Sequence, residues 1–237
     1  MATVLAIDTS AKPVSCAVAQ DNRILASFYA NTGLTHSQTL MTMVEQTLQM
    51  TNLTVDQLDA IAVNAGPGSF TGVRIGVSAV KGIAFTNDIP CISVSTLEAM
   101  AQQVSAPSNT LICGAMDARC QQVYTALFEI DEVGETKRLT QDEALSLSEL
   151  EILLNQQDRP VVLVGDGSEL CYKTLKDAVS HLSLAPASVR FQNASGTALV
   201  AVKKFNKGEA VTAEALLPEY LRLPQAEREL NARMSSN

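Results

Sequence analysis

Histidine and tryptophan are scarce in this sequence, and their scarcity limits the chemistry that the protein can support. The 237 residues contain no tryptophan and only two histidines, His36 and His181. These two lie too far apart to form the His-x-x-x-His or His-Glu-x-x-His pair that presents two imidazoles to one metal ion. Neither stands in a recognisable serine or cysteine hydrolase motif. We therefore expect no metal site, no bound cofactor and no nucleophilic hydrolysis.

Cysteine is present, but in no pattern that is typical of a zinc site or a disulfide framework. The five cysteines are odd in number and widely spaced, and none belongs to a Cys-x-x-Cys pair. We expect reduced and mostly buried thiols, as in proteins of a reducing compartment.

Basic residues are too few and too scattered for a nucleic-acid-binding surface. The chain has 17 lysines and arginines against 25 aspartates and glutamates, a net charge of −8, and a pI of about 4.8. A protein that binds nucleic acid by itself normally carries a basic stripe, because neutralising phosphates supplies much of the affinity. We expect no direct binding to nucleic acid by the isolated chain.

Long apolar runs are also missing. None approaches the roughly 20 residues that span a bilayer, and the first eight residues lack the basic and apolar regions of a secretion signal. Hydrophobic residues nevertheless make up 46% of the chain, enough for a substantial core. We expect a folded cytoplasmic protein that does not contact a membrane.

The hydrophobic pattern of the first part predicts three strands followed by alternating helices and strands. The predicted strands cover residues 3–8, 14–19, 24–30, 60–63 and 90–94, and the helices 36–50, 73–85 and 96–104. This order builds a mixed sheet covered by helices and is typical of one half of the ribonuclease-H-like and actin-like folds. Pro107, Ser108 and Asn109 then break the pattern. We place a boundary there, with one lobe at residues 1–106 and a second at residues 107–237.

The second part repeats the plan more weakly. Its predicted strands cover residues 110–116, 123–130 and 161–164, and its helices 147–154, 170–182 and 194–205. Residues 217–222 and a polar, helix-prone tail close the sequence. We predict an α/β protein with a duplicated ASKHA (actin-like) fold, in which two mixed-sheet lobes are each covered by helices.

A glycine-rich segment at residues 66–72 is the strongest local motif. Gly66, Gly68 and Gly72 allow positive φ and close backbone approach, and a helix follows directly. Free N–H groups at such a helix start can bind a phosphate, although the segment matches neither the Walker A nor the dinucleotide spacing. Asp8, Thr9 and Ser10 end the first strand and are candidates for the same vestigial phosphate site. A tight strand-to-helix turn explains the glycines equally well. The Asp117-Ala118-Arg119 segment ends a comparable strand in the second half, where a solvated turn is the simpler interpretation.

Two helices of the first part carry more apolar surface than one sheet face needs. In the helix at residues 36–50 the apolar side chains spread over roughly 180°, whereas a helix on a sheet needs little more than 100°. The helix at residues 73–85 is apolar nearly all round. Core packing explains part of this surplus, and a helical partner interface explains the rest. The candidate interface residues are His36, Leu40, Met41, Val44, Leu48, Val73, Gly76, Val77 and Val80.

Several segments match the signature segments of a known family. They cover residues 5–10, 36–41, 66–76, 94–100, 117–119 and 218–222. The Gly-Pro-Gly-Ser-Phe-Thr-Gly segment, continued by Val-Arg-Ile-Gly, is the most specific of them. On these residues the chain resembles the TsaB family, and the match extends from residue 4 to residue 222.

The resemblance implies a non-catalytic subunit. TsaB proteins are similar to TsaD, the catalytic subunit that transfers a threonylcarbamoyl group to N6 of adenosine 37 in tRNAs reading ANN codons. The resemblance implies TsaD and TsaE as partners, a homodimer when TsaD is absent, and a last helix that returns to the first lobe. The metal-binding His-x-x-x-His of the catalytic relative corresponds to Thr96 and Met100 here, which cannot hold the metal. One alternative stays open: an actin-like ATPase or phosphotransferase that uses Asp8 and residues 66–72 and 165–167.

Overall fold

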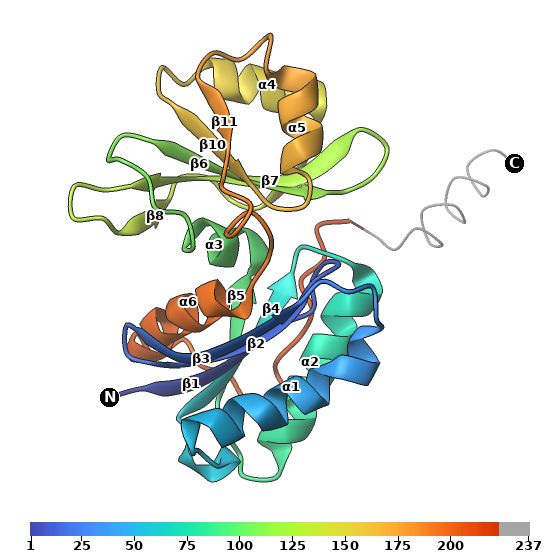
Figure 1. The fold of residues 1–237 in the computed structure, drawn as a ribbon, viewed down its shortest axis with the longest axis vertical. Helices are drawn as coiled ribbons and strands as arrows, with labels where there is room; N and C mark the ends of the chain where they lie inside the picture. Colours follow the sequence, from blue (N-terminus) through green and yellow to red (C-terminus); the bar gives the residue numbers. More distant parts are fainter. Residues whose placement is uncertain (223–237) are drawn as a thin grey trace, which may run out of the picture.

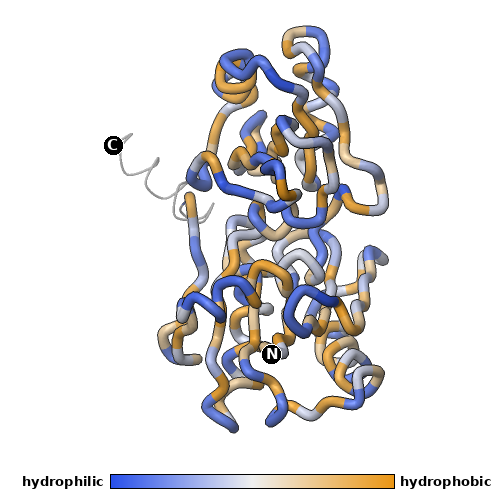
Figure 2. The backbone as a smooth tube through the Cα atoms, turned by 90° about the vertical axis from the view of Figure 1, so that its left-hand side faces the viewer, coloured by the Kyte–Doolittle hydropathy of each residue, from blue (hydrophilic) through white to orange (hydrophobic). Residues whose placement is uncertain are grey.

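Two mixed sheets form the framework of the protein (Figure 1). The structure is a computed structural model that describes residues 1–222. The predicted helix-prone tail lies outside these residues. We call the five-stranded sheet and the helices on its outer face lobe 1, and the six-stranded sheet and the helices on its outer face lobe 2. No helix in the described part is long and apolar enough to cross a membrane, and hydrophobic and hydrophilic residues intermix along both lobes (Figure 2).

The sheet of lobe 1 has the strand order β3-β2-β1-β4-β5. Its strands are β1 (Thr3–Asp8), β2 (Val14–Gln20), β3 (Arg23–Ala30), β4 (Ala60–Gly66) and β5 (Cys91–Ser95). The first three are antiparallel neighbours, and β4 and β5 continue the sheet parallel to β1. Because alternate residues of a strand point to opposite faces, β1 sends Leu5 and Ile7 into one core and Val4 and Ala6 into another.

Helices α1 (His36–Thr51) and α2 (Phe70–Phe85) cover the outer face of this sheet, with the short 3-10 turn η1 (Val55–Gln57) between them. Helix α1 buries Leu40, Val44 and Leu48, which recur every four residues and so lie on one stripe. Helix α2 starts at Phe70, three residues before the predicted start, because Ser69 caps it: the Ser69 side chain accepts a hydrogen bond from the Gly72 N–H.

Lobe 2 repeats the topology of lobe 1. Its strands are β6 (Leu111–Asp117), β7 (Gln122–Ile130), β8 (Thr136–Arg138), β9 (Glu143–Ser146), β10 (Val161–Val164) and β11 (Leu182–Leu184). The order β8-β7-β6-β10-β11 corresponds to β3-β2-β1-β4-β5, with β9 added beside β7. Helices α4 (Leu147–Asn155) and α5 (Ser168–Leu175) cover its outer face. The predicted duplicated α/β fold is confirmed.

One predicted helix is wrong over its second half. The hydrophobic pattern of residues 170–182 predicts one continuous helix, but α5 ends at Leu175, and Leu182 begins strand β11. Strand β11 pairs in parallel with β10, with Leu182 opposite Val161. Pairing with a distant strand thus overrides the local helical pattern.

The third helix of each half crosses to the other lobe. Helix α3 (Thr96–Ala101) sends Leu97 and Met100 into the inner core of lobe 2, and α6 (Ala194–Asn206) packs on the inner face of the lobe 1 sheet. That face is built largely of alanine, so its small side chains allow α6 to approach closely. The two helices touch between the sheets (Figure 1). The predicted domain boundary between residues 106 and 107 stays a prediction. Helix α3, before it, packs in lobe 2, and helix α6, after it, packs on lobe 1.

Candidate functional site

Asp8 lies buried at the end of β1, where Ser10 folds back over it. The Ser10 N–H and hydroxyl donate hydrogen bonds of 2.9 and 2.7 Å to Asp8 Oδ1. The other carboxylate oxygen, Oδ2, has no hydrogen-bond partner among residues 1–222. Burial raises the pKa of Asp8, and the hydrogen bonds from Ser10 offset only part of this effect.

Asn64 and Thr197 continue this polar cluster toward α6. The Thr197 hydroxyl donates a 2.9 Å hydrogen bond to Asn64 Oδ1, and both side chains are fully buried. The Asn64 amide is also close enough to lower the pKa of Asp8. Asp8 therefore lies beside a buried polar contact between the sheet of lobe 1 and helix α6, and both Asp8 Oδ2 and Asn64 Nδ2 lack a hydrogen-bond partner among residues 1–222.

The glycines of residues 66–72 pack against the end of β1. The Ser69 N–H donates to the Ser10 carbonyl at 2.6 Å, and the Thr9 hydroxyl donates to the Gly72 carbonyl at 2.7 Å. A Cβ on Gly68 would overlap the Ser10 carbonyl oxygen, and one on Gly72 would overlap that of Thr9. The predicted phosphate-site residues do come together, but this geometry favours close packing as the role of the glycines.

Gly66 is covered by the end of the described chain. It adopts a φ of +142°, which favours glycine, and a Cβ there would overlap the carbonyl oxygen of Glu219. The Glu219 N–H donates to the Ala65 carbonyl at 2.7 Å. The protein's own backbone thus fills the space beside the first glycine of the motif.

Two carboxylates of lobe 2, Asp117 and Asp166, lie near strand ends, as Asp8 does in lobe 1. The Gln192 side chain donates a 3.0 Å hydrogen bond to Asp166, and burial raises the pKa of this carboxyl group. Asp117 accepts hydrogen bonds from the backbone N–H and the guanidinium of Arg119. Residues 117–119 thus form a turn that Asp117 stabilises from within, as the simpler interpretation of the sequence expects.

Thr96 and Met100 do not fit a metal ion. Both side chains are fully buried, and Met100 packs in an apolar core with Leu97, Ile112 and Phe128. The Thr96 hydroxyl lacks a partner within residues 1–222, but a single hydroxyl beside a thioether offers too few ligands for a divalent cation. No group of three or more histidine, cysteine, aspartate or glutamate side chains in the described part is arranged to hold a metal.

The buried cysteine thiols are also unsuited to nucleophilic catalysis. Cys16, Cys91, Cys113 and Cys171 are buried, and Cys120 is exposed. Burial raises the pKa of Cys16 to about 12 and that of Cys113 to about 11, so both stay protonated and poorly nucleophilic.

The structure divides the predicted interface residues into buried and accessible ones, and their role in an interface stays a prediction. Seven of the nine are buried inside lobe 1: Leu40, Val44, Leu48, Val73, Gly76, Val77 and Val80. Met41 is 51% exposed, and His36 is half-buried. The apolar pattern of the two helices overestimated the surface that is free to bind a partner, because α1 and α2 pack on each other as well as on the sheet.

Other apolar side chains of the same helices do reach the surface. Met50 and Phe85 are 70% and 79% exposed, at the ends of α1 and α2. Phe70, Arg74 and Ile75 line a shallow hollow of about 480 Å³ on α2, together with Thr71 and Ser78. Phe85 ends a pattern that the sequence assigned to helix, and only its exposure in the fold distinguishes it from a core residue.

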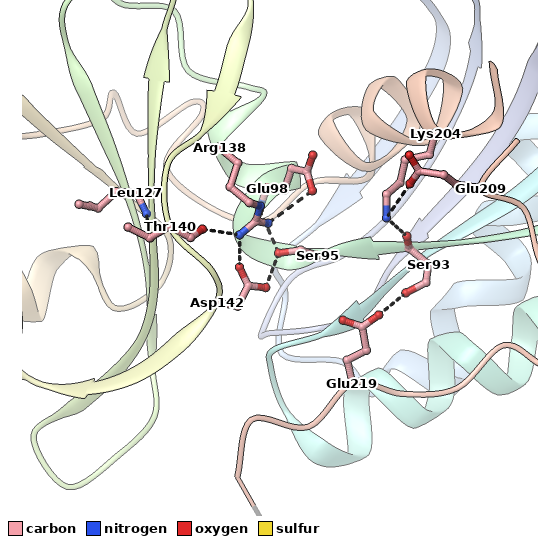
Figure 3. A network of polar contacts seen from close by, with 10 residues as sticks. All are labelled: Ser93, Ser95, Glu98, Leu127, Arg138, Thr140, Asp142, Lys204, Glu209 and Glu219. Carbon is pink, nitrogen blue, oxygen red and sulfur yellow. Dashed lines mark hydrogen bonds and ion pairs between the residues drawn. The ribbon is translucent and has the colours of Figure 1, made fainter. Parts of the chain in front are cut away.

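A polar cavity of about 320 Å³ lies between the lobes, and no pattern in the sequence predicts it. Its lining residues are Pro67, Ser95, Glu98, Arg138, Gln141, Asp142, Lys204, Glu219 and Leu221. Figure 3 shows the polar contacts of its charged residues: one network surrounds Arg138, and a second joins Lys204 and Glu219 to Ser93. Arg138 bonds Glu98 and Asp142, and Asp142 accepts a 2.6 Å hydrogen bond from the Ser95 hydroxyl. Arg138 thus offsets the charge of one of these two carboxylates, and all three charged groups are held by contacts within the wall.

Comparison with known proteins places the chain in a family. The family described as TsaD, tRNA N6-adenosine threonylcarbamoyltransferase, matches residues 30–230. The tRNA threonylcarbamoyladenosine biosynthesis protein TsaB of Bacillus subtilis is 32% identical over 226 residues, which cover 95% of this chain and 96% of that protein. TsaB of Escherichia coli is 32% identical over 220 residues, 92% of this chain and 94% of that protein.

Two solved structures match the fold of this chain over nearly its whole length. YeaZ from Pseudomonas aeruginosa superimposes with a TM-score of 0.77 at 29% identity, covering 93% of this chain and 100% of that one. A second structure from the same organism, described as an uncharacterized protein with similarity to peptidase YeaZ, gives a TM-score of 0.79 at 28% identity and covers 94% and 100%. With sequence relatives that align almost from end to end and a family match over most of its length, the chain belongs to the TsaB family, within the wider TsaD family.

Proposed function

We propose that this chain is a non-catalytic subunit in the biosynthesis of threonylcarbamoyladenosine in tRNA. In this role it binds TsaD and acts together with TsaE. It thereby supports transfer of the threonylcarbamoyl group to N6 of adenosine 37 in tRNAs reading ANN codons. The names of the sequence relatives support the pathway, and the description of the matching family supports the reaction.

The buried state of Thr96 and Met100 is the observation that carries the non-catalytic role. These positions correspond to the metal-binding histidines of the catalytic relative, and here they belong to an apolar core. The glycine segment offers no substitute site, because Thr9, Ser10 and Glu219 fill the space beside it. An enzyme needs groups that stabilise a transition state, and neither place supplies them.

The exposed faces of α1 and α2 are the proposed binding surface for TsaD. Met41, Met50 and Phe85 are exposed there, and methionine and aromatic side chains are enriched at protein interfaces. We propose that a second copy of the chain occupies the same surface when TsaD is absent. The two assemblies then compete.

The net charge of −8 supports a role without independent tRNA binding. We propose that the chain works in the cytoplasm through its protein partners and leaves tRNA contacts to them.

Light scattering coupled to size exclusion tests the binding proposal. We expect the chain alone to elute as a homodimer and TsaD to convert it into a mixed assembly. A chain that stays monomeric alone and does not bind TsaD would refute the proposal. Calorimetry with ATP·Mg²⁺ tests the actin-like ATPase alternative in the same preparation. We expect no heat of binding, whereas tight binding by the isolated chain would favour that alternative.

A further inference from the structure

The last described residues form a strap that begins as part of lobe 1. After α6 the chain returns along the edge of the sheet, where Val211 and Cys91 exchange backbone hydrogen bonds of 2.8 and 2.9 Å. Leu216 is 1% exposed and packs in the outer core of lobe 1. Residues 207–216 are therefore integral to this lobe.

Glu219 fits into a notch that only glycine allows. Its backbone is bonded to Ala65 and lies against Gly66, as described above. Its carboxylate accepts a 2.7 Å hydrogen bond from the Ser93 hydroxyl (Figure 3). The main chain of Glu219 is thus fixed to the end of β4, and its side chain to the middle of β5.

Tyr220 is fixed to the first turn of α2. Its ring stacks on Phe70 with centroids 4.8 Å apart and planes inclined by 29°. The Tyr220 hydroxyl accepts a 2.8 Å hydrogen bond from Arg74 Nε, and the Arg74 guanidinium lies 3.8 Å from the centre of the Phe70 ring. Stacking and cation–π contacts of this kind are attractive, so together they hold Tyr220 on α2.

Arg222 then crosses to lobe 2. Its guanidinium donates a 3.2 Å hydrogen bond to the carbonyl of Ala118, in the turn between β6 and β7. Leu221, between these two anchors, lines the polar cavity that separates the lobes. In Figure 1 this end of the strap, in red, runs into the space between the two sheets.

We propose that residues 219–222 act as a clamp that ties the first turn of α2 to lobe 2 and holds the interlobe cavity at one width. Lobe 1 anchors the clamp through Glu219 and Tyr220, and lobe 2 is held by Arg222. The opposite wall of the cavity consists of polar contacts, such as that between Ser95 and Asp142, which water can replace. The exchanged helices α3 and α6 hold the lobes together at the centre, so release of Arg222 lets the lobes open about this helix pair at the edge that the clamp spans, while each lobe keeps its own core.

Distance measurements between spin labels on the two lobes of the full chain test the clamp. The labels are carried by Asn22→Cys between β2 and β3 and Gln156→Cys after α4, both exposed positions outside α1 and α2, in a Cys120→Ser background that removes the exposed native thiol. Labelled chain is diluted with unlabelled chain, so that only distances within one chain are measured. The variants are Arg222→Ala and Tyr220→Ala. Leu217→Ala is the matched control, because Leu217 lies on the same strap and is 64% exposed.

We expect one narrow distance distribution for the unmodified strap and for Leu217→Ala, and a broader distribution with a shifted mean for Arg222→Ala and Tyr220→Ala. Melting curves accompany each sample to show that both lobes stay folded. Within residues 1–222 the Arg222 side chain makes one hydrogen bond, to a backbone carbonyl of lobe 2, so its variant keeps the test valid even if Tyr220→Ala destabilises lobe 1. A folded Arg222→Ala protein with the unmodified distance distribution would overturn the proposal.

Discussion

Thr9 and Gly72 fit together as two parts of one packing contact. The Thr9 hydroxyl donates to the Gly72 carbonyl at 2.7 Å, and the Thr9 carbonyl oxygen occupies the space that a Cβ on residue 72 needs. This contact joins the end of β1 to the first turn of α2. The glycine motif that suggests a phosphate loop in the sequence thus has a structural function in the fold.

A pair of glycine substitutions in α2 tests this packing contact. Gly72→Ala should lower the free energy of unfolding by about 1–3 kcal/mol, because its methyl group meets a backbone oxygen that cannot move easily. Gly82→Ala is the matched control: no atom lies within 4 Å of its Cβ position, and alanine in a helix interior stabilises by about 0.5–1 kcal/mol. Urea unfolding measures both. Equal effects from the two variants would show that the contact with Thr9 is unimportant.

Neighbouring residues of α1 separate partner binding from stability. Met41→Glu changes a side chain that is 51% exposed, so it should alter the free energy of unfolding by no more than about 0.5 kcal/mol and abolish both the homodimer and the assembly with TsaD. Leu40→Ala empties a core position that is 1% exposed and should cost about 2–5 kcal/mol. Its folded fraction should still assemble. Intact assemblies with Met41→Glu, measured by light scattering, would exclude α1 from the interface.

The stability of the protein should respond to the ionisation of Asp8. Its folded pKa lies above the unfolded value because of burial, so the folded state binds the proton more tightly. Stability is then greatest where Asp8 is protonated in both states, and it falls as the pH rises from the unfolded pKa through the folded pKa.

Asp8→Asn should remove the loss of stability that ionisation of Asp8 causes at higher pH. The amide keeps an acceptor for Ser10, so the variant should be more stable than the wild type at pH 7.5, and the difference should shrink at pH 4.5. Chemical unfolding at the two pH values measures it, with Asp158→Asn as the matched aspartate-to-asparagine change at an exposed position. A variant less stable than the wild type at pH 7.5 would mean that the buried carboxylate contributes favourably in its charged form.

Restoring the histidines of the catalytic relative should not restore a metal site. In a Thr96→His and Met100→His double variant, two imidazoles must enter a packed apolar core, where an unpaired polar group costs about 1–3 kcal/mol. We expect a lower melting temperature that added Zn²⁺ or Fe²⁺ does not raise. If added metal raised the melting temperature by many degrees, the backbone around residues 96 and 100 would still be able to form a metal site once the histidine side chains are present.

The strands and helices of lobe 1 are predictable because their patterns are strong. Strand β1 is a continuous apolar run, and α1 repeats its buried residues every four positions. Strands β8 and β11 are three residues long and carry no such pattern. They exist because β7 and β10 offer unpaired edges, which only the folded sheet provides.

The functional surfaces are less predictable for a related reason. A helical projection locates Leu40 and Met41 on the same broad apolar arc, but only the packed fold buries one and exposes the other. Arg138 contacts Glu98, which is 40 residues away in the sequence, and it lies on strand β8, which was not predicted. No local sequence pattern therefore indicates the polar network between the lobes. The end of the strap is comparable: Tyr220 reaches Phe70 only because the chain returns to lobe 1.

A reconstituted tRNA modification assay measures the central claim most directly. It combines purified TsaD, TsaE, ATP, threonylcarbamoyl-AMP and an unmodified tRNA that reads ANN codons, with and without this chain. We predict modification of adenosine 37 only when the chain is present, no modification by the chain alone, and loss of its effect with Met41→Glu. Full modification without the chain, or turnover by the chain alone, would contradict the role of an essential non-catalytic subunit.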